Sequence, residues 1–404
     1  MTTKPRIQSS LMVQISRSSL LAIILVAAIR ELLYVLAPES SSLNPVDYLL
    51  FAVSLPYLFI AYSYGKAYSR RIVLLLLSIS LVVAALGQIQ LGHSLDFTTY
   101  IKFTFPVTIL VLSAGYLLPL RESHIRTIYG LLFLLALAGE IRVFGSQSNV
   151  NITEVRHSTA YLLIGVAIVV SVSRISKVPK VLSVAVLIIP LAFINVATAV
   201  IALGVFFILE LSIFWRLNVA ARALLGASVI ISVVFTRVDL LNLKAQDLGL
   251  LGSGRIAAWE DGINSFFRHG FYDQLLGQGS GSSYQFWGVW WWSQKDIHSD
   301  FLRVLIEYGV IVFLVTLAGF LLLYVRLLKI EPTSSSVLAS AIAASLISNG
   351  VLGRPYAAVL WALAIVVSAN ASRRKSEEFR DDAAYELQVE NLREPSKSRP
   401  RWTL

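Results

Sequence analysis

The chain contains no cysteine and unusually few charged residues. Without a thiol it can form no disulfide framework, no thiolate metal site and no cysteine nucleophile. Charged residues make up 14% of the 404 residues, whereas soluble domains average about 25%. Hydrophobic residues make up 56%, and the mean hydropathy is +0.71. Because so few polar groups cannot cover the surface of a protein in water, the composition predicts an integral membrane protein.

Long apolar runs extend over most of the chain. A membrane helix needs roughly 20 predominantly apolar residues, and runs of this kind lie at 19–37, 47–64, 72–91, 100–120, 128–144, 158–173, 178–194, 195–214, 221–236, 301–323, 336–350 and 355–371. We therefore predict an all-α integral membrane protein with about 12 transmembrane helices. The basic N-terminal segment is followed by a long run without a small-residue cleavage site, which favours an uncleaved first span over a signal peptide.

Basic residues alternate between the connections of these runs. Short cytoplasmic loops are enriched in Lys and Arg, and every second connection carries them: Lys66, Arg70 and Arg71; Arg121 and Arg126; Arg174, Lys177 and Lys180; Arg216 and Arg222; Arg326 and Lys329. Both termini fall on this basic side. The net charge of +10 is thus mainly a topology signal, and we predict that both termini are cytoplasmic.

The same pattern divides the chain into four parts. Residues 1–236 are predicted to form an N-terminal bundle of about nine spans, and 301–371 to form three more. Between helices 9 and 10, residues 237–300 are predicted to form one large structured periplasmic loop, because loops of this length are usually functional or disordered and five tryptophans argue against disorder. Residues 372–404 are predicted to be a basic, disordered cytoplasmic tail.

Ten cations break the alternation because they lie outside or within the predicted spans. They are Arg30, Lys102, Arg142, Arg156, Arg237, Arg255, Arg268, Lys295, Arg303 and Arg354. Since arginine binds phosphate through a planar fork of donors, a cluster of them on the outer face predicts an anionic ligand. The alternative is that single side chains reach to lipid headgroups, and both interpretations stay open for each residue.

The loop contains a predicted helix over 256–267. Ser253 is a candidate N-cap, and Arg255 lies at the N-terminal end, where backbone N–H groups and the helix dipole favour an anion. A second interpretation, compatible with the first, is an amphipathic helix on the membrane surface, with Trp259 and Phe266 inserted into lipid. The glycine-rich stretch 277–281 follows no predicted strand, so we interpret it as a turn and not as a nucleotide-binding loop.

The tenth span begins with a group of polar residues. Ser299 is a candidate N-cap, and the i, i+3, i+7 spacing of Asp300, Arg303 and Glu307 predicts that they share one helix face. Charged residues inside a span usually point into the bundle and mark a functional site. His298 is a candidate general base, whereas an interfacial histidine without a catalytic role is the alternative.

Three blocks in this region, in this order, resemble the signature of the O-antigen ligase/polymerase family. They are Ser253-Gly254-Arg255-x-x-x-Trp259, Gly277-x-Gly279-x-Gly281 and His298-x-Asp300-x-Leu302-x-x-Leu305-x-Glu307-x-Gly309. The resemblance covers about 252–313, and elsewhere it is one of hydropathy and span count. Arg142-x-x-Gly145 followed by His157 resembles a weaker upstream element. Many members carry a Ser-Arg pair before the loop, where this chain has Asn195-Val196-Ala197-Thr198.

The resemblance implies a GT-C-like membrane glycosyltransferase that takes its donor glycan from polyprenyl diphosphate, such as undecaprenyl diphosphate. It implies that His298 activates the acceptor hydroxyl and that Arg255 neutralises the leaving diphosphate. Arg142 and Arg156 are the candidates to replace the missing family arginine. Asp300, Arg303 and Trp259 complete the predicted substrate-binding residues, and neither a metal nor another cofactor is expected.

Three functions remain open from the sequence. The first is a polymerase of lipid-linked repeat units for O-antigen or exopolysaccharide, at the periplasmic face of the bacterial inner membrane. The second is a ligase that transfers the glycan to a lipid A core during lipopolysaccharide assembly. The third is a transporter or flippase of lipid-linked sugars, although the chain lacks the internal repeat common in transporters. In each case the partners are lipid-linked glycans and membrane lipids, and no nucleic acid is expected.

Overall fold

The computed structural model describes residues 5–36, 43–91, 97–116, 118–145, 152–173, 184, 187, 197–214, 217–218, 220–222, 224, 255–284, 297, 299–348 and 350–372. Every regular element among them is helical. The longer helices are α1 (Pro5–Leu36), α2 (Leu43–Tyr64), α3 (Ala67–Leu91), α4 (Phe97–Gly115), α5 (Glu122–Gly145), α6 (Ile152–Val172), α8 (Ala197–Phe214), α13 (Asp300–Ile330), α14 (Pro332–Ile347) and the final helix Pro355–Ser372. The loop contributes α11 (Arg255–Arg268), α12 (Phe271–Leu276) and the short helix η3 (Ser282–Tyr284).

These helices agree with the predicted spans. Ten of the twelve predicted spans coincide with described helices, and the runs 178–194 and 221–236 lie almost wholly outside the described residues. Five helices are long and apolar enough to cross a membrane: Leu11–Arg30, Ala67–Ile89, Glu122–Ile141, Asp300–Ile330 and Pro355–Ser372. Five shorter apolar helices lie among them, so the helical membrane architecture is confirmed while the number of twelve crossings stays a prediction.

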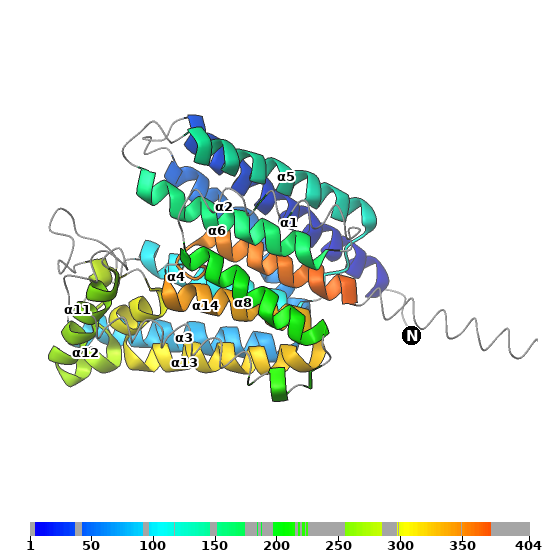
Figure 1. Ribbon diagram of the computed structural model, residues 1–404. Coiled ribbons are helices and arrows are strands. Elements are labelled where there is room, and N and C mark those ends of the chain that lie inside the picture. Colours follow the sequence, from blue (N-terminus) through cyan, green and yellow to red (C-terminus); the bar gives the residue numbers. More distant parts are fainter. Residues whose placement is uncertain are drawn as a thin grey trace, which may run out of the picture.

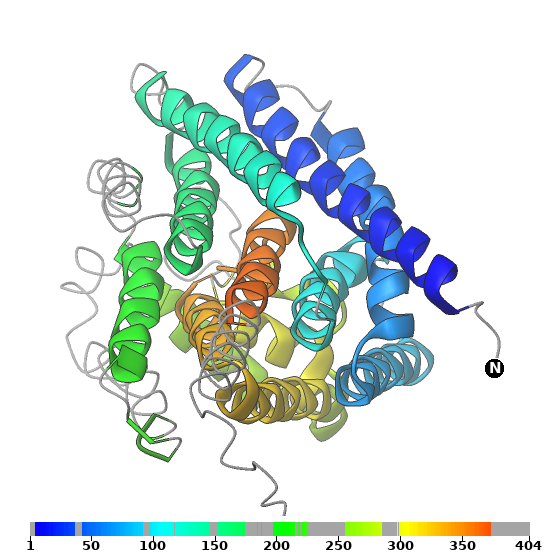
Figure 2. The ribbon, with the colours of Figure 1, turned by 90° about the vertical axis from the view of Figure 1, so that its right-hand side faces the viewer.

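The final helix forms the centre of the bundle. Figure 2 shows it, in orange-red, enclosed by the other long helices. Side chains from Tyr356 to Val367 are almost all buried, including Trp361, whose indole N–H donates to Ser340 of α14 at 2.8 Å. On its other side, Gly165 of α6 packs directly against Leu360. The surrounding helices leave apolar side chains exposed, such as Leu322 and Ile89, as lipid-facing helices do.

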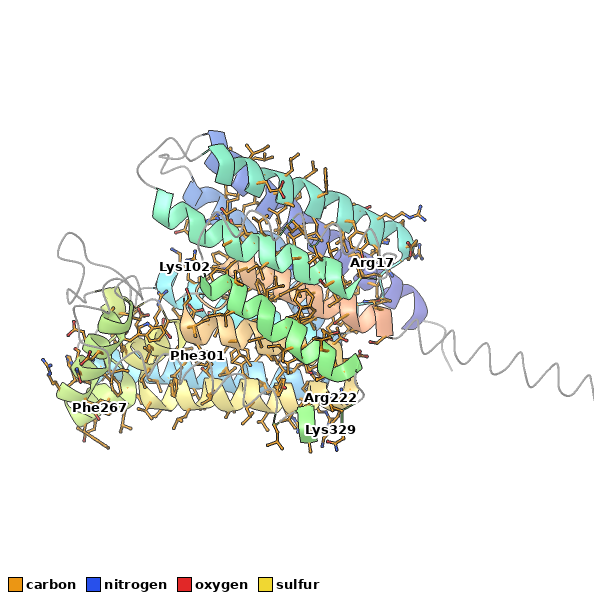
Figure 3. The ribbon with its side chains drawn as sticks, viewed as in Figure 1. Arg17, Lys102, Arg222, Phe267, Phe301 and Lys329 are labelled. Carbon is orange, nitrogen blue, oxygen red and sulfur yellow. The ribbon has the colours of Figure 1, made fainter. Side chains whose placement is uncertain are left out.

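The two ends of the bundle differ. Figure 1 places α11, α12 and the start of α13 at one end, which we call the α11 end, and the start of α1 at the other. Figure 3 shows Arg17, Arg222 and Lys329 toward the end opposite α11, whereas Lys102 lies toward the α11 end. Basic residues of the first helix and of two predicted cytoplasmic connections therefore lie toward the same end of the bundle.

The helix α11 corrects one interpretation. Phe266 is 3% exposed and packs with Ile297 and Ile306, so the part of the membrane-surface interpretation that inserts Phe266 into lipid is wrong. The side chain that faces outward is the next one, Phe267, which is 67% exposed and labelled at the outer corner in Figure 3. A shift of one residue turns a helical side chain by about 100°, which explains why the two neighbours have opposite environments.

Candidate functional site: a basic cavity at the α11 end

A cavity of about 210 Å³ lies among α1, α2, α4, α6, α13 and the turn before the final helix. Four of its lining residues are cations, namely Arg30, Lys102, Arg303 and Arg354. The remaining lining residues are Leu50, Phe51, Leu162, Gly353, Pro355, Tyr356 and Ala357, so no acidic residue is among those that line it in the described part of the chain. All four cations belong to the set that breaks the positive-inside pattern.

Aromatic rings support two of the arginines. The guanidinium carbon of Arg30 lies 4.1 Å from the centre of the Tyr356 ring, and that of Arg354 lies 5.7 Å from the centre of the Tyr161 ring. Both tyrosines are buried, at 5% and 0% exposure. A cation over an aromatic face is attracted by the ring quadrupole, so these contacts hold two positive groups at the wall of the cavity without neutralising their charge.

Arg303 is held by a carboxylate on the next turn of α13. Its Nε donates to Oε1 of Glu307 at 3.2 Å, and the hydroxyl of Ser283 donates to the same oxygen at 2.6 Å. Arg303 is 8% exposed and Glu307 is 1% exposed. The pair is thus a buried ion pair at i, i+4, which confirms the prediction that these residues share a helix face.

The first turn of α13 also positions the turn that carries Arg354. The Ser299 hydroxyl caps the helix by accepting from the Leu302 N–H at 3.4 Å, as predicted. Asp300 accepts from the Leu352 N–H at 3.0 Å through Oδ2, and its own N–H donates to the Ser348 carbonyl at 3.3 Å. Asp300 therefore fixes the turn before the final helix against α13, so that arginines from two elements reach one cavity.

The glycine-rich stretch is a turn, as predicted, and it pairs with a kink in α13. Gly309 has φ 75° and ψ 176°, which interrupts the helix. The carbonyl of Ile306 accepts from the Gln278 N–H at 2.8 Å, and that of Glu307 accepts from the Gly279 N–H at 3.2 Å. The turn thus supplies donors to carbonyls that the kink releases from the helical ladder.

The structure brings some of the predicted site residues together and leaves others apart. Arg303 lies in the wall of the cavity. Asp300 is not among the lining residues, but it accepts from the N–H of Leu352, two positions before the lining residue Arg354. Trp259 is half-buried and packs against the cluster of Phe266, Ile297 and Ile306, outside the set of lining residues. The side chains of Arg142, Arg156 and Arg255 lie outside the described residues, as does His298.

Other members of the site were not among the predicted site residues. Arg30, Lys102 and Arg354 had a signal in the sequence, since each is a cation where the topology gives no reason for one. The two tyrosines that support the arginines, Tyr161 and Tyr356, had no comparable signal, because an aromatic residue in an apolar helix is ordinary.

No known family model matches the chain, and no curated protein is detectably similar to it. The resemblance to the O-antigen ligase/polymerase family therefore stays a prediction, carried by the residues that compose it. Among the described residues, no group of three or more His, Asp or Glu side chains is placed to hold a metal ion. The expectation that the protein needs no metal also stays a prediction.

The arrangement suits an anion with several oxygens. Arg30, Lys102 and Arg354 bring three positive groups to the cavity beside the ion-paired Arg303, and like charges that are brought close together repel one another. An anion offsets this repulsion and receives charge-assisted hydrogen bonds. At roughly 30 Å³ per water molecule, the cavity has the space of about seven waters, which accommodates a phosphate or a diphosphate.

Proposed function

We propose that the chain is a membrane glycosyltransferase that polymerises oligosaccharide repeat units carried on polyprenyl diphosphate. The observation that supports the proposal best is the cavity with four cations and no acidic lining residue among the described residues. A polyprenyl diphosphate combines a small anionic group with a long apolar chain. The cavity offers cations beside Leu50, Phe51 and Leu162, and so matches both halves of that molecule.

The length of α13 supports an interfacial position for the cavity. The kink at Gly309 divides α13 into a short part that carries Arg303 and a longer part, residues 310–330. At 1.5 Å per residue the longer part spans about 31 Å, which matches the hydrocarbon core of a bilayer, about 30 Å thick. If the longer part crosses the core, Arg303 lies beyond the core at headgroup level, where a diphosphate would lie.

The proposed reaction is a displacement at the anomeric carbon of the donor sugar. The acceptor hydroxyl oxygen forms a bond to this carbon and transfers its proton to His298, while the bond from the carbon to the diphosphate oxygen breaks. The leaving diphosphate retains the electron pair, and the cavity arginines and Arg255 stabilise the negative charge that develops on it. His298 adjoins Ser299, which caps the helix that carries Arg303.

The test is glycan transfer by the full chain in proteoliposomes that contain a polyprenyl-diphosphate oligosaccharide. We expect a ladder of products on a gel, lost in His298→Ala and Arg255→Ala and reduced at least tenfold in Arg354→Gln. Arg326→Gln is the matched control, because Arg326 also lies over a tyrosine ring, that of Tyr68 at 5.5 Å, but in the last turns of α13.

Other outcomes separate the alternatives. Transfer that occurs only after a lipid A core is added would identify a ligase. Movement of the lipid-linked sugar between leaflets without any transfer would contradict the enzyme and leave the transporter. Equal loss in Arg354→Gln and Arg326→Gln would mean that the cavity has no special part in the reaction.

A further inference from the structure

Glu307 connects the basic cavity to the described part of the loop, residues 255–284, which we call the outer loop. Its backbone carbonyl accepts from Gly279, and its Oε1 accepts from both Ser283 and Arg303. Gly279 lies in the turn between α12 and η3, Ser283 lies in η3, and Arg303 lines the cavity. One residue therefore bonds the loop on one side and a cavity cation on the other.

Stability alone does not account for this arrangement. Glu307 and Arg303 are 1% and 8% exposed, and the loss of hydration of two buried charges offsets most of their attraction, so an apolar pair of similar size is often as stable. Geometry offers a better account. The guanidinium is planar with donors in a rigid fork, so a bond from Nε to a fixed oxygen fixes the plane in which its remaining N–H groups lie.

The oxygen is itself fixed from the loop. Ser283 is fully buried and donates to it at 2.6 Å, and the preceding turn is held against α13 by the Gln278 and Gly279 N–H groups. Gly277 allows this close approach, because a Cβ there would overlap the Glu307 carbonyl. The orientation of Arg303 thus depends on contacts that exist only when the loop is seated on the kink.

We propose that Glu307 is a positioning residue that orients Arg303 toward an anion in the cavity, and that Ser283 makes this orientation depend on seating of the outer loop. The proposal rests on the proposed function for the identity of the anion, a polyprenyl diphosphate. It assigns the loop a part in donor binding through Arg303, in addition to any group that the loop contributes itself. The site is complete only when the loop and α13 are joined.

Two effects of Glu307 on an anion have opposite signs. Its negative charge competes with the ligand for Arg303, so removing the charge strengthens anion binding if competition dominates. Its oxygen orients the guanidinium, so removing the oxygen weakens anion binding if positioning dominates. Glu307→Ala removes both charge and oxygen, whereas Glu307→Gln removes the charge and keeps an acceptor oxygen. The two variants therefore separate the effects.

The experiment measures the affinity of the full-length, detergent-solubilised protein for inorganic diphosphate by calorimetry, with thermal unfolding as a second measurement. We expect Glu307→Ala to weaken binding about tenfold, and Glu307→Gln to stay within about threefold of the unchanged protein. Ser283→Ala is expected to weaken binding about threefold. Its matched control is Ser282→Ala, since the neighbouring Ser282 hydroxyl donates to the Gly279 carbonyl at 2.8 Å within the same turn.

A double variant tests whether Glu307 acts through Arg303. Arg303→Gln combined with Glu307→Ala is expected to bind diphosphate no more weakly than Arg303→Gln alone, because non-additive effects mark residues that act together. A purely structural role for Glu307 predicts a lower unfolding temperature with unchanged affinity in Glu307→Ala. An effect of Glu307 that is independent of Arg303 predicts additive losses of affinity in the double variant. Either result, or tighter binding in both Glu307 variants, would overturn the positioning role.

The outcomes distinguish this proposal from the proposed function. Diphosphate binding with the expected pattern but without glycan transfer would reject the glycosyltransferase and leave the positioning role of Glu307 intact. Glycan transfer with unaltered diphosphate affinity in Glu307→Ala and Ser283→Ala would support the glycosyltransferase and reject the positioning role of Glu307. An unchanged protein that binds no diphosphate would overturn the positioning role.

Discussion

Gly277 and Gly309 lie against each other where the turn after α12 crosses α13. A Cβ on Gly309 would overlap the Leu275 carbonyl and the backbone of Gly277, and a Cβ on Gly277 would overlap the Glu307 carbonyl. Both glycines also have positive φ, 84° and 75°, which side chains disfavour. The crossing therefore requires glycine twice, for space and for backbone conformation.

Gly277→Ala and Gly309→Ala are each expected to destabilise the protein by about 2–4 kcal/mol, because strain in this backbone region costs about 1–3 kcal/mol and the clash adds to it. Thermal unfolding in detergent measures the change. Gly281→Ala is the matched control, since Gly281 also has positive φ, 87°, but has no atom within 4 Å of a Cβ. An equal loss in all three variants would show that strain alone decides and that the crossing is not tight.

The ring of Tyr356 is expected to matter for anion binding more than its hydroxyl. Tyr356→Phe keeps the aromatic face under Arg30 and should leave diphosphate affinity within about twofold. Tyr356→Leu removes a contact worth about 0.5–2 kcal/mol, which corresponds to a loss of affinity between about twofold and thirtyfold. Calorimetry with inorganic diphosphate compares the two. Equal affinities would mean that Arg30 is held by other contacts.

Asp300 is expected to act on the turn that carries Arg354. Asp300→Ala removes an acceptor of the buried Leu352 N–H, which should lower the free energy of unfolding by about 1–3 kcal/mol and weaken diphosphate binding as the turn shifts. Asp300→Asn keeps an acceptor oxygen and should lose less. Glu260→Ala, at an exposed position of α11, serves as the control. A loss of stability in Asp300→Ala without any change in diphosphate affinity would contradict the prediction that this turn positions Arg354 for binding.

The exposures of two cavity cations predict different salt dependence. Lys102 is exposed and Arg303 is buried, and salt screens exposed charges far more than buried ones. Lys102→Gln is expected to weaken diphosphate binding about threefold at low ionic strength and to have little effect near 1 M salt. Arg303→Gln should weaken it at least tenfold at either ionic strength. Binding titrations over this range of salt compare the two variants. A loss of affinity that depends more on salt in Arg303→Gln than in Lys102→Gln would contradict the prediction.

Local patterns in the sequence predicted local features of this protein. The capping by Ser299 and the shared face of Arg303 and Glu307 follow from helical spacing. Ten of the predicted spans coincide with helices, because each is a long and continuous apolar run. The turn at 277–281 was predicted as well. Its pairing with α13 was not, because nothing in either segment specifies which carbonyls a kink will release.

The cavity required the tertiary structure. Topology marked Arg30, Lys102 and Arg354 as cations without an explanation, but they lie on α1, on α4 and before the final helix, up to 324 positions apart in the sequence. Tyr161 and Tyr356 also required the tertiary structure. In the sequence they are ordinary residues of apolar helices, and only the fold places the guanidinium groups of Arg354 and Arg30 over their rings. Hydrophobicity and helical periodicity act along one segment and are therefore readable from the sequence itself. Which side chains share a cavity depends on how helices pack against one another, and that is decided by complementary shape and charge between segments distant in the chain.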